Sequence, residues 1–162
     1  MKAVTLIELI IVIIILGILV LAAVPNIDSY FYAKLNSCAQ KINADIRYTQ
    51  YLSIAEHKTY GMEFDAANNY YRVYDPDTGD LAKDPYTRVN MELDLDTSVE
   101  YTGISIAGVN IDSSDEIRFT SLGEPLNGSG ADLSSTGVIT LSYKGSSKQI
   151  SIYPVTGWVE VQ

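Results

Sequence analysis

A single carboxylate, Glu8, lies near the start of an apolar run that continues to Val24. A charged side chain placed in hydrocarbon costs about 2.5–3.5 kcal/mol on insertion scales, so a carboxylate in such a run indicates a function. The partner that it needs is a positive charge, and the same peptide can supply one as a free α-amino group. That amine would exist if a protease cut the chain between Ala3 and Val4. The spacing therefore predicts a pairing between Glu8 and a new N-terminus.

Three further carboxylates, Asp75, Asp77 and Asp80, lie close together around the turn-forming Gly79. Oxygen ligands at such spacing suit Ca²⁺, although their order differs from that of an EF-hand and Tyr86 stands where the bidentate Glu would be. The other interpretation is a tight turn between two strands, for which Asp, Pro and Gly are the preferred residues. The turn is favoured, and a calcium site at the three carboxylates is the alternative.

The remaining reactive residues do not assemble into a catalytic pattern. His57 is the only histidine, and a helix cap or a solvent contact is expected of it rather than a role as a general base. Cys38 is the only cysteine, which excludes an intrachain disulfide and favours a buried structural thiol. One histidine without further cysteines cannot build a zinc site, and no nucleophile elbow or phosphate-binding glycine motif occurs. The sequence predicts a protein that is not an enzyme and that carries no cofactor.

The charge of the chain is acidic, with a formal net charge of −9 at pH 7. All but one of the 11 Lys and Arg residues and all but one of the 20 Asp and Glu residues lie beyond Pro25. An acidic surface keeps a domain soluble and opposes association with phosphate backbones, so a nucleic-acid partner is not expected.

The elements that position Glu8 follow from the apolar pattern. Residues 4–24 form a stretch of 21 residues, about the length that crosses a bilayer as a helix. Apolar residues then recur at steps of three or four, which is typical of an amphipathic helix, and no Gly or Pro interrupts residues 27–58. We expect one long helix from about Val4 to about Glu56, with its first half in lipid and its second half against a globular head. The apolar stripe of the second half is Ile27, Phe31, Leu35, Cys38, Ile42, Ile46, Thr49 and Leu52.

From Thr59 onward the chain breaks into short segments that are rich in β-branched and aromatic residues and bounded by turn formers. Ile139, Leu141 and Tyr143 share one face, as in an antiparallel sheet with one covered side. The predicted fold class is α+β, a long N-terminal helix packed on a mainly antiparallel β-sheet head. The predicted strands are Thr59–Asp65, Tyr70–Tyr74, Arg88–Leu95, Val99–Ile106, Glu116–Thr120, Val138–Tyr143, Gln149–Tyr153 and Trp158–Val161, with a long loop at Leu122–Ser135.

The segment from Ala3 to Leu9 resembles the class III signal sequence of type IV pilins and type II secretion pseudopilins. In that family a short basic leader ends in a small residue, and a Glu is the fifth residue after the cut, as Glu8 is from Val4. Two positions depart from the family pattern, since Ala3 replaces the usual Gly and Val4 replaces the frequent Phe. The resemblance implies cleavage after Ala3 by prepilin peptidase, N-methylation of Val4 and assembly through Glu8.

The resemblance also implies how the chain is organised. Residues 1–3 would be the leader, residues 4–25 a transmembrane and filament-core helix, and residues 26–162 a periplasmic head with its helix at about 26–56 and its strands at 59–162. Gly17 and Pro25 fall where pilins interrupt the transmembrane helix. The implied location is the inner membrane, crossed once with a cytoplasmic N-terminus, and a filament after assembly. The implied partners are other pilin or pseudopilin subunits, prepilin peptidase and the inner-membrane assembly platform.

Three C-terminal segments are similar to the H-type minor pseudopilins and their minor-pilin relatives. They are Ile117–Gly123 with its Phe-x-x-x-Gly end, the pair around Gly137–Gly145, and Lys148–Gly157. The similarity implies a minor subunit of a secretion pseudopilus or of a type IV pilus rather than a major one.

Other interpretations compete with this one. A secretory signal peptide could use Lys2 and a cleavage site at Val20-Leu21-Ala22, but the leader before Glu8 is very short. A plain membrane anchor would need no carboxylate in its second turn. For the head, the alternatives are a minor pilin of competence that binds DNA, and a membrane-anchored enzyme or solute-binding protein. DNA-binding relatives carry arginines beside the Gly of the final strand, whereas here Gly157 is followed by Trp158.

A surface for partners is expected on the loops far from the helix stripe. The candidates are Leu122, Asn127 and Ser129 in the long loop, joined by Trp158. Because successive side chains of a strand alternate between its faces, Trp158 should point outward if Val159 faces the core. The alternative is that Trp158 covers a second small core.

Overall fold

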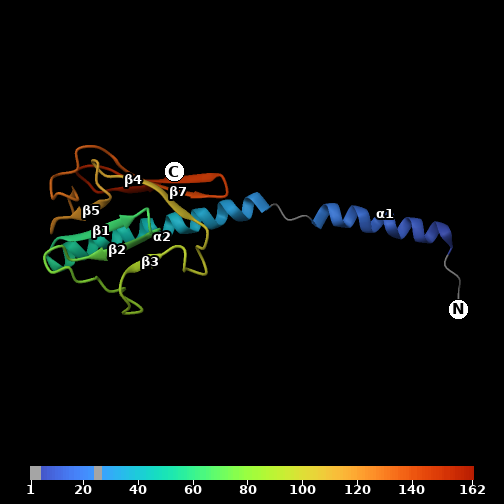
Figure 1. Cartoon of the computed structure of the whole chain (residues 1–162), viewed down its shortest axis with the longest axis horizontal. Helices are drawn as coiled ribbons and strands as arrows, with labels where there is room; N and C mark the ends of the chain where they lie inside the picture. Colours follow the sequence, from blue (N-terminus) through green and yellow to red (C-terminus); the bar gives the residue numbers. More distant parts are fainter. Residues whose placement is uncertain (1–4, 24–26) are drawn as a thin grey trace. The chain divides into compact units, whose positions relative to one another are not determined.

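A computed structural model describes residues 5–23 and 27–162 of the chain (Figure 1). The chain divides into two compact units, residues 1–30 and residues 31–162, and each is described by itself. The predictions that concern Ala3, Val4 and Pro25 lie outside the described residues.

In the first unit, helix α1 covers Leu6–Ala23. Thr5 caps its start, because its Oγ1 accepts a hydrogen bond from the Glu8 backbone N at 3.4 Å. Thr5 and Glu8 thus have the spacing of a capping box, in which a Ser or Thr precedes a Glu by three residues. Helix α1 passes through Gly17 without a break. Among the described residues, no helix combines the length and the hydropathy that a membrane crossing requires.

Helix α2 covers Ile27–Glu56, so the structure describes two helices where one from Val4 to Glu56 was expected, and residues 24–26 between them lie outside the description. The end at Glu56 agrees with the prediction and has a local cause. His57 adopts a left-handed backbone with φ of 55°, and the Lys58 N donates to the Ser53 carbonyl at 3.2 Å. This is the Schellman arrangement, which satisfies carbonyls at the last turn of a helix. His57 therefore acts through its backbone at a helix terminus.

The head contains two antiparallel sheets. The first has the order β3-β2-β1-β5-β6. Its strands are β1 at Tyr60–Asp65, β2 at Tyr70–Tyr74, β3 at Glu92–Asp94, β5 at Glu116–Phe119 and β6 at Pro125–Asn127. The second has the order β4-β7-β8-β9, with β4 at Ser105–Asn110, β7 at Gly137–Tyr143, β8 at Ser146–Ile152 and β9 at Val159–Val161. The α+β prediction is confirmed, with two sheets in place of one.

One core joins α2 to both sheets. The stripe predicted on the second half of the helix is buried at Leu35, Cys38, Ile42, Ile46 and Thr49. It packs with inward side chains of the sheets in a single cluster, the largest of which are Phe64, Tyr71, Phe119, Met62, Ile117 and Ile139. The cluster supplies the apolar burial that stabilises the head.

A buried polar contact ties α2 to β2 within this core. The Tyr71 hydroxyl donates to Asp45 Oδ2 at 2.5 Å, and Lys41 Nζ lies 2.6 Å from Asp45 Oδ1. Asp45 is only 7% exposed, so the two donors compensate the burial of its charge.

Two strand predictions and the loop prediction differ most from the structure. Val99–Ile106 was predicted as a strand, but residues 99–103 form turns and β4 runs over Ser105–Asn110. Tyr101 and Ile104 are the apolar residues that suggested a strand. Both are buried although they lie in the turns or directly after them, and the Asn69 side chain donates to the Ile104 carbonyl at 2.8 Å.

The other two differences concern residues 88–95 and residues 122–135. The segment predicted at Arg88–Leu95 contributes only Glu92–Asp94, because the Asp84 carboxylate accepts bonds from the backbone of Tyr86 and Thr87 and holds a turn before it. The expected loop at 122–135 contains strand β6, which pairs with β5.

Candidate assembly surface

Helix α1 presents a row of exposed apolar side chains around Glu8. From Leu6 to Leu19 the large apolar side chains are 45–76% exposed in this chain. Glu8 is the only charged residue of the helix, and its backbone N is bonded to the Thr5 side chain. Exposed apolar surface of this extent marks a site of interaction with protein or membrane.

On the head, two side chains of α2 hold the loops that precede β6 and β9. Gln50 Nε2 donates to the Gly123 carbonyl at 2.7 Å and to the Thr156 carbonyl at 3.0 Å. Arg47 Nη2 donates to the Val159 carbonyl at 2.8 Å. Turns that are far apart in the sequence are thereby fixed on one stretch of helix.

Two glycines allow these turns to approach α2 closely. A Cβ on Gly157, whose φ is +63°, would lie 2.6 Å from Gln50 Nε2 and 3.0 Å from Phe119 Cε1. A Cβ on Gly123 would lie 2.8 Å from Ile54 Cδ1. The two glycine-ended segments that resemble minor pseudopilins therefore meet the same part of α2.

Trp158 lies beside these turns with its ring outward. It is 58% exposed, whereas the adjacent Val159 is 1% exposed, as the strand alternation predicted. The Arg47 guanidinium carbon lies 4.8 Å from the centre of the Trp158 ring, which is cation–π geometry. Trp158 thus contacts a helix side chain and does not belong to the buried core cluster.

Other exposed apolar side chains lie on α2 and on the turns that Gln50 holds. Arg47 is followed on α2 by side chains four and seven residues later, which lie on the same face of the helix. We call the group the tryptophan surface; its members are Tyr51 (64% exposed), Ile54 (44%), Leu122 (78%), Val155 (80%) and Trp158. Ile54 contacts the Gly123 turn beside Leu122, and Val155 precedes the Thr156 carbonyl that Gln50 binds.

The structure separates the four residues predicted as a surface for partners into two groups. Leu122 and Trp158 flank the same part of α2, whereas Asn127 ends β6 and Ser129 lies in the turn that follows it. The Asn127 Oδ1 accepts bonds from the Ser129 N at 3.0 Å, the Ser129 Oγ at 2.6 Å and the Ala131 N at 3.1 Å. The Asn127 side-chain oxygen is therefore occupied by hydrogen bonds within its own turn, and Ser129 remains exposed.

The acidic segment around Gly79 has the geometry of a turn. Asp75 is 6% exposed, its Oδ1 accepts the Asp77 N at 2.9 Å, and its Oδ2 lies 3.6 Å from Lys58 Nζ. Asp77 and Asp80 are exposed. Within residues 5–23 and 27–162, no group of three or more His, Cys, Asp and Glu side chains could hold a metal ion.

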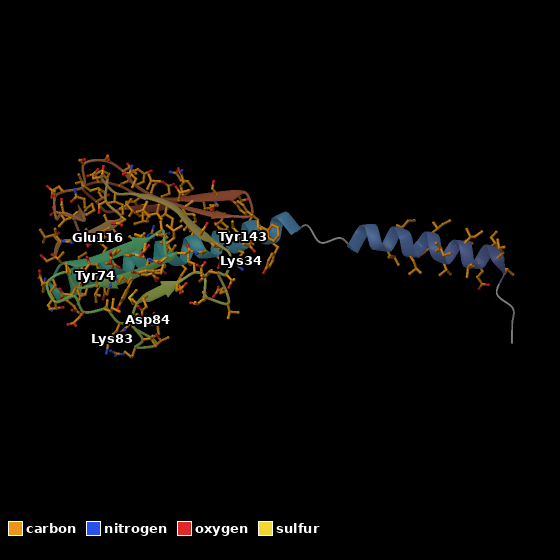
Figure 2. The ribbon with its side chains drawn as sticks, in the orientation of Figure 1. Lys34, Tyr74, Lys83, Asp84, Glu116 and Tyr143 are labelled. Atoms are coloured by element: carbon orange, nitrogen blue, oxygen red, sulfur yellow. The ribbon has the colours of Figure 1, made fainter. Side chains whose placement is uncertain are left out.

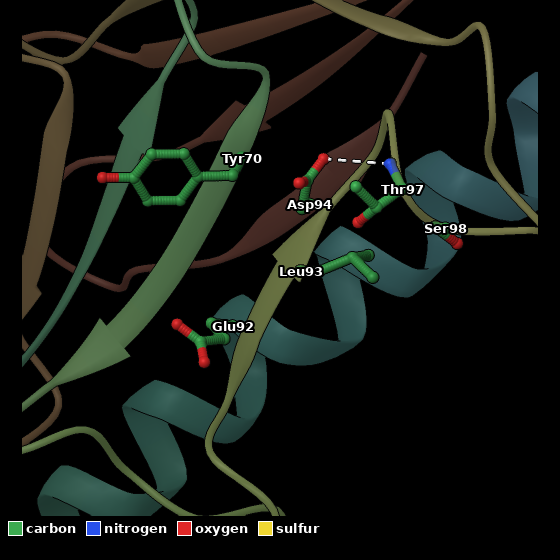
Figure 3. Close-up of a pocket in the computed structure, with 6 residues that line it drawn as sticks. All are labelled: Tyr70, Glu92, Leu93, Asp94, Thr97 and Ser98. Carbon is green, nitrogen blue, oxygen red and sulfur yellow. Dashed lines mark hydrogen bonds between the residues drawn. The ribbon is translucent and has the colours of Figure 1, made fainter.

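The edge of the first sheet carries an open groove of about 610 Å³ (Figure 3). Tyr70 of β2 and Glu92, Leu93 and Asp94 of β3 line it, with Thr97 and Ser98 at its end. The Asp94 Oδ1 accepts the Thr97 N at 3.1 Å, so this carboxylate closes a turn. The bond to the turn lowers the pKa of Asp94 below its usual value.

Sequence reasoning missed Arg47 and Gln50, which organise the tryptophan surface. Neither belongs to the apolar stripe that located the helix. The signal that could have located them is the pair of glycine-ended turns, whose carbonyls need donors from a neighbouring element.

The chain has the fold of minor pilins and pseudopilins. The type IV minor pilin FimU of Pseudomonas aeruginosa strain PAO1 is similar with a TM-score of 0.58 over 81% of this chain and 90% of its own, at 12% identity. The minor pseudopilin EpsH from the type 2 secretion system of Vibrio cholerae has a TM-score of 0.58 over 80% of this chain and 96% of its own, at 12% identity. A second crystal form of FimU has a TM-score of 0.53, with coverages of 79% and 92% and 13% identity.

No protein-family model and no curated protein matches the sequence. The expectation of a pilin or pseudopilin fold is confirmed by the solved structures.

Proposed function

We propose that this chain is a minor pilin or pseudopilin, a structural subunit of a type IV pilus or of a type II secretion pseudopilus, and not an enzyme. The observation that carries the proposal is the fold shared with FimU and EpsH over about four fifths of this chain and at least 90% of theirs. The pilin-type signal around Glu8 supports it independently, since it belongs to the N-terminal segment rather than to the head.

Processing is the first step of the proposed function. Prepilin peptidase removes residues 1–3, and Val4 becomes an N-methylated terminus. The helix of residues 4–25 then anchors the chain once in the inner membrane, with the head in the periplasm. The exposed apolar row on α1 supports this step, because such a row needs a covering of lipid or of other helices.

Assembly is the second step, driven by the inner-membrane platform. The apolar helices bundle in the filament core, where Glu8 of one subunit meets the Val4 amine of a neighbour. A buried charge whose partner is missing destabilises by about 3–5 kcal/mol, so the pair enforces register between subunits. Gly17 and Pro25 let the helix between them loosen as it packs.

The tryptophan surface is the proposed contact of the head with other subunits. Exposed aromatic residues beside an Arg are the types that dominate binding energies in protein interfaces. Their position on turns fixed by Gln50 and Arg47 gives this surface a defined shape. Asn127 and Ser129, at the end of β6 and in its following turn, are a second proposed contact.

The variant Glu8→Leu tests the assembly step. Because this variant lacks the carboxylate, it avoids the insertion cost of about 2.5–3.5 kcal/mol. It should therefore enter the membrane at least as well as the natural chain. It should nevertheless fail to crosslink or copurify with the other subunits. The control Ile10→Leu keeps the carboxylate and the apolar row and should incorporate normally. Incorporation of Glu8→Leu at the natural level would refute the role of Glu8.

A further inference from the structure

Lysines and aromatic rings gather where the first turns of α2 in the head meet the β7–β8 hairpin. The Phe31 ring packs edge-on against the Tyr143 ring at 5.4 Å. Lys34 Nζ lies 5.3 Å from the centre of the same ring and donates to the Thr102 carbonyl at 2.9 Å. Figure 2 shows Lys34 and Tyr143 side by side at one end of the head.

The hairpin adds two more cations at this end. Lys148 Nζ lies 4.9 Å from the centre of the Tyr32 ring, which is 53% exposed. Lys144 is exposed at the hairpin turn, where it has a φ of 50°. We call this group the basic end; its members are Phe31, Tyr32, Lys34, Tyr143, Lys144 and Lys148.

Among the residues that the structure describes, no ion pair involves a lysine of the basic end. The four ion pairs among the described residues use Lys41, Lys58, Arg72 and Arg118. The charges of Glu100 and Lys34 both act on the Cys38 thiol, so one carboxylate lies in the neighbourhood of Lys34. Three lysines, Lys34, Lys144 and Lys148, therefore gather at one end of the head on a chain whose net charge is −9.

The covalent chain ties this end of the head to the apolar helix. Helix α1 ends at Ala23 and the head begins at Phe31. The basic end contains Phe31, so it includes the residue at which the chain that follows α1 enters the head.

We infer that the basic end is a docking surface for the anionic phospholipid headgroups of the membrane that holds α1, an inference that rests on the proposed function. Lysines near an anionic leaflet bind its phosphates, and tyrosines are enriched at the level of the headgroups. The acidic remainder of the head is repelled by the same surface, so the two effects together orient the head with its basic end on the lipid. Extraction into a filament must break this contact.

Energy transfer in nanodiscs tests the inference with the full chain. A fluorophore is placed on Ser146→Cys beside the hairpin turn, and an acceptor is placed on lipid headgroups. Cys38 is fully buried and its pKa is raised to about 12, so it stays unlabelled. Transfer should be stronger in nanodiscs that contain phosphatidylglycerol than in phosphatidylcholine alone, and 1 M salt should remove the difference, because the Debye length is then about 3 Å.

A pair of double variants separates the basic end from general charge. Lys144→Gln with Lys148→Gln should lower transfer in anionic nanodiscs to the level seen with phosphatidylcholine. Lys83→Gln with Arg88→Gln removes the same charge from exposed residues of the segment between β2 and β3, and should leave transfer unchanged.

Each contrary result has a distinct meaning. Equal transfer in both lipids, or no effect of the hairpin variant, overturns the inference and leaves the proposed function intact. A chain that fails to enter nanodiscs contradicts the membrane anchor and this inference with it. If duplex DNA removes the transfer at the same salt, the basic end is a nucleic-acid surface, which also overturns the inference.

Discussion

At the scale of single residues, Trp158 connects the architecture of the head to its proposed contacts. Its ring is 58% exposed and rests on Arg47, so the folded head gains little from it. In an interface the same ring could be fully desolvated, and truncation of such a residue costs about 2 kcal/mol or more of binding free energy.

The variant Trp158→Ala should therefore separate binding from stability. We expect the melting temperature of residues 27–162 to fall by a few degrees at most, because an exposed cation–π contact is worth about 0.5–1 kcal/mol. Capture of partner subunits should weaken. The matched control Val159→Ala removes a side chain that is 1% exposed and should cost about 2 kcal/mol of unfolding free energy. A large loss of melting temperature in Trp158→Ala would show that the ring belongs to the core.

Because of Cys38, the stability of the folded head should fall at alkaline pH. Burial raises the pKa of its thiol from 9.0 to about 12. Above pH 9 the unfolded chain loses this proton while the folded chain keeps it, so the folded state binds more protons and its stability falls as the pH rises. The pKa of Tyr101 is raised in the same direction, mainly by burial, to about 12.

Urea unfolding between pH 8 and pH 11 measures this dependence. The natural head should lose stability steadily through that range. Cys38→Ala should be less stable at pH 8, since it leaves a small cavity, but it should lose less between pH 8 and pH 11. Equal losses in both proteins would show that the thiol does not contribute.

At the scale of elements, the turn before β9 packs closely against α2 because it contains a glycine. Gly157→Ala would force a side chain within 2.6 Å of Gln50 Nε2 in a backbone with φ of +63°. The left-handed backbone alone costs about 1–2 kcal/mol for a residue with a Cβ, and the clash should add to it.

The control for Gly157→Ala is Gly130→Ala. Gly130 has a φ of +84° with no heavy atom within 4 Å of its Cβ position, so its substitution measures the backbone cost alone. Chemical denaturation should show a larger loss for Gly157→Ala. Equal losses would mean that the contact with Gln50 relaxes freely.

The sequence predicted the elements where local and tertiary preferences agree. Strands β1, β2, β5 and β7 were located to within a residue or two because alternation matches burial along them. The prediction failed at Val99–Ile106, where Ile104 is buried through a turn that the distant Asn69 side chain stabilises. Arg47 and Gln50 were missed for the same reason, since their acceptors lie 73 or more residues away in the chain.

At the scale of the whole molecule, the chain combines an apolar helix surface with an acidic head surface. Helix α1 exposes apolar side chains around one carboxylate, and the head carries almost all of the acidic charge. A filament subunit needs both properties, because its helix must leave lipid for a protein core while its head stays in water. This combination, on a fold shared with FimU and EpsH, is the basis of the account.

The mature N-terminus shows whether the chain is processed as a pilin-type subunit. The protein is purified from cells that contain prepilin peptidase, and its intact mass and N-terminal peptide are measured by mass spectrometry. We expect a chain that begins at Val4 and carries one additional methyl group on its α-amine. A chain that begins at Ala22 or Ala23 would mean an ordinary signal peptide and would contradict the proposal that this protein assembles as a pilin-type subunit.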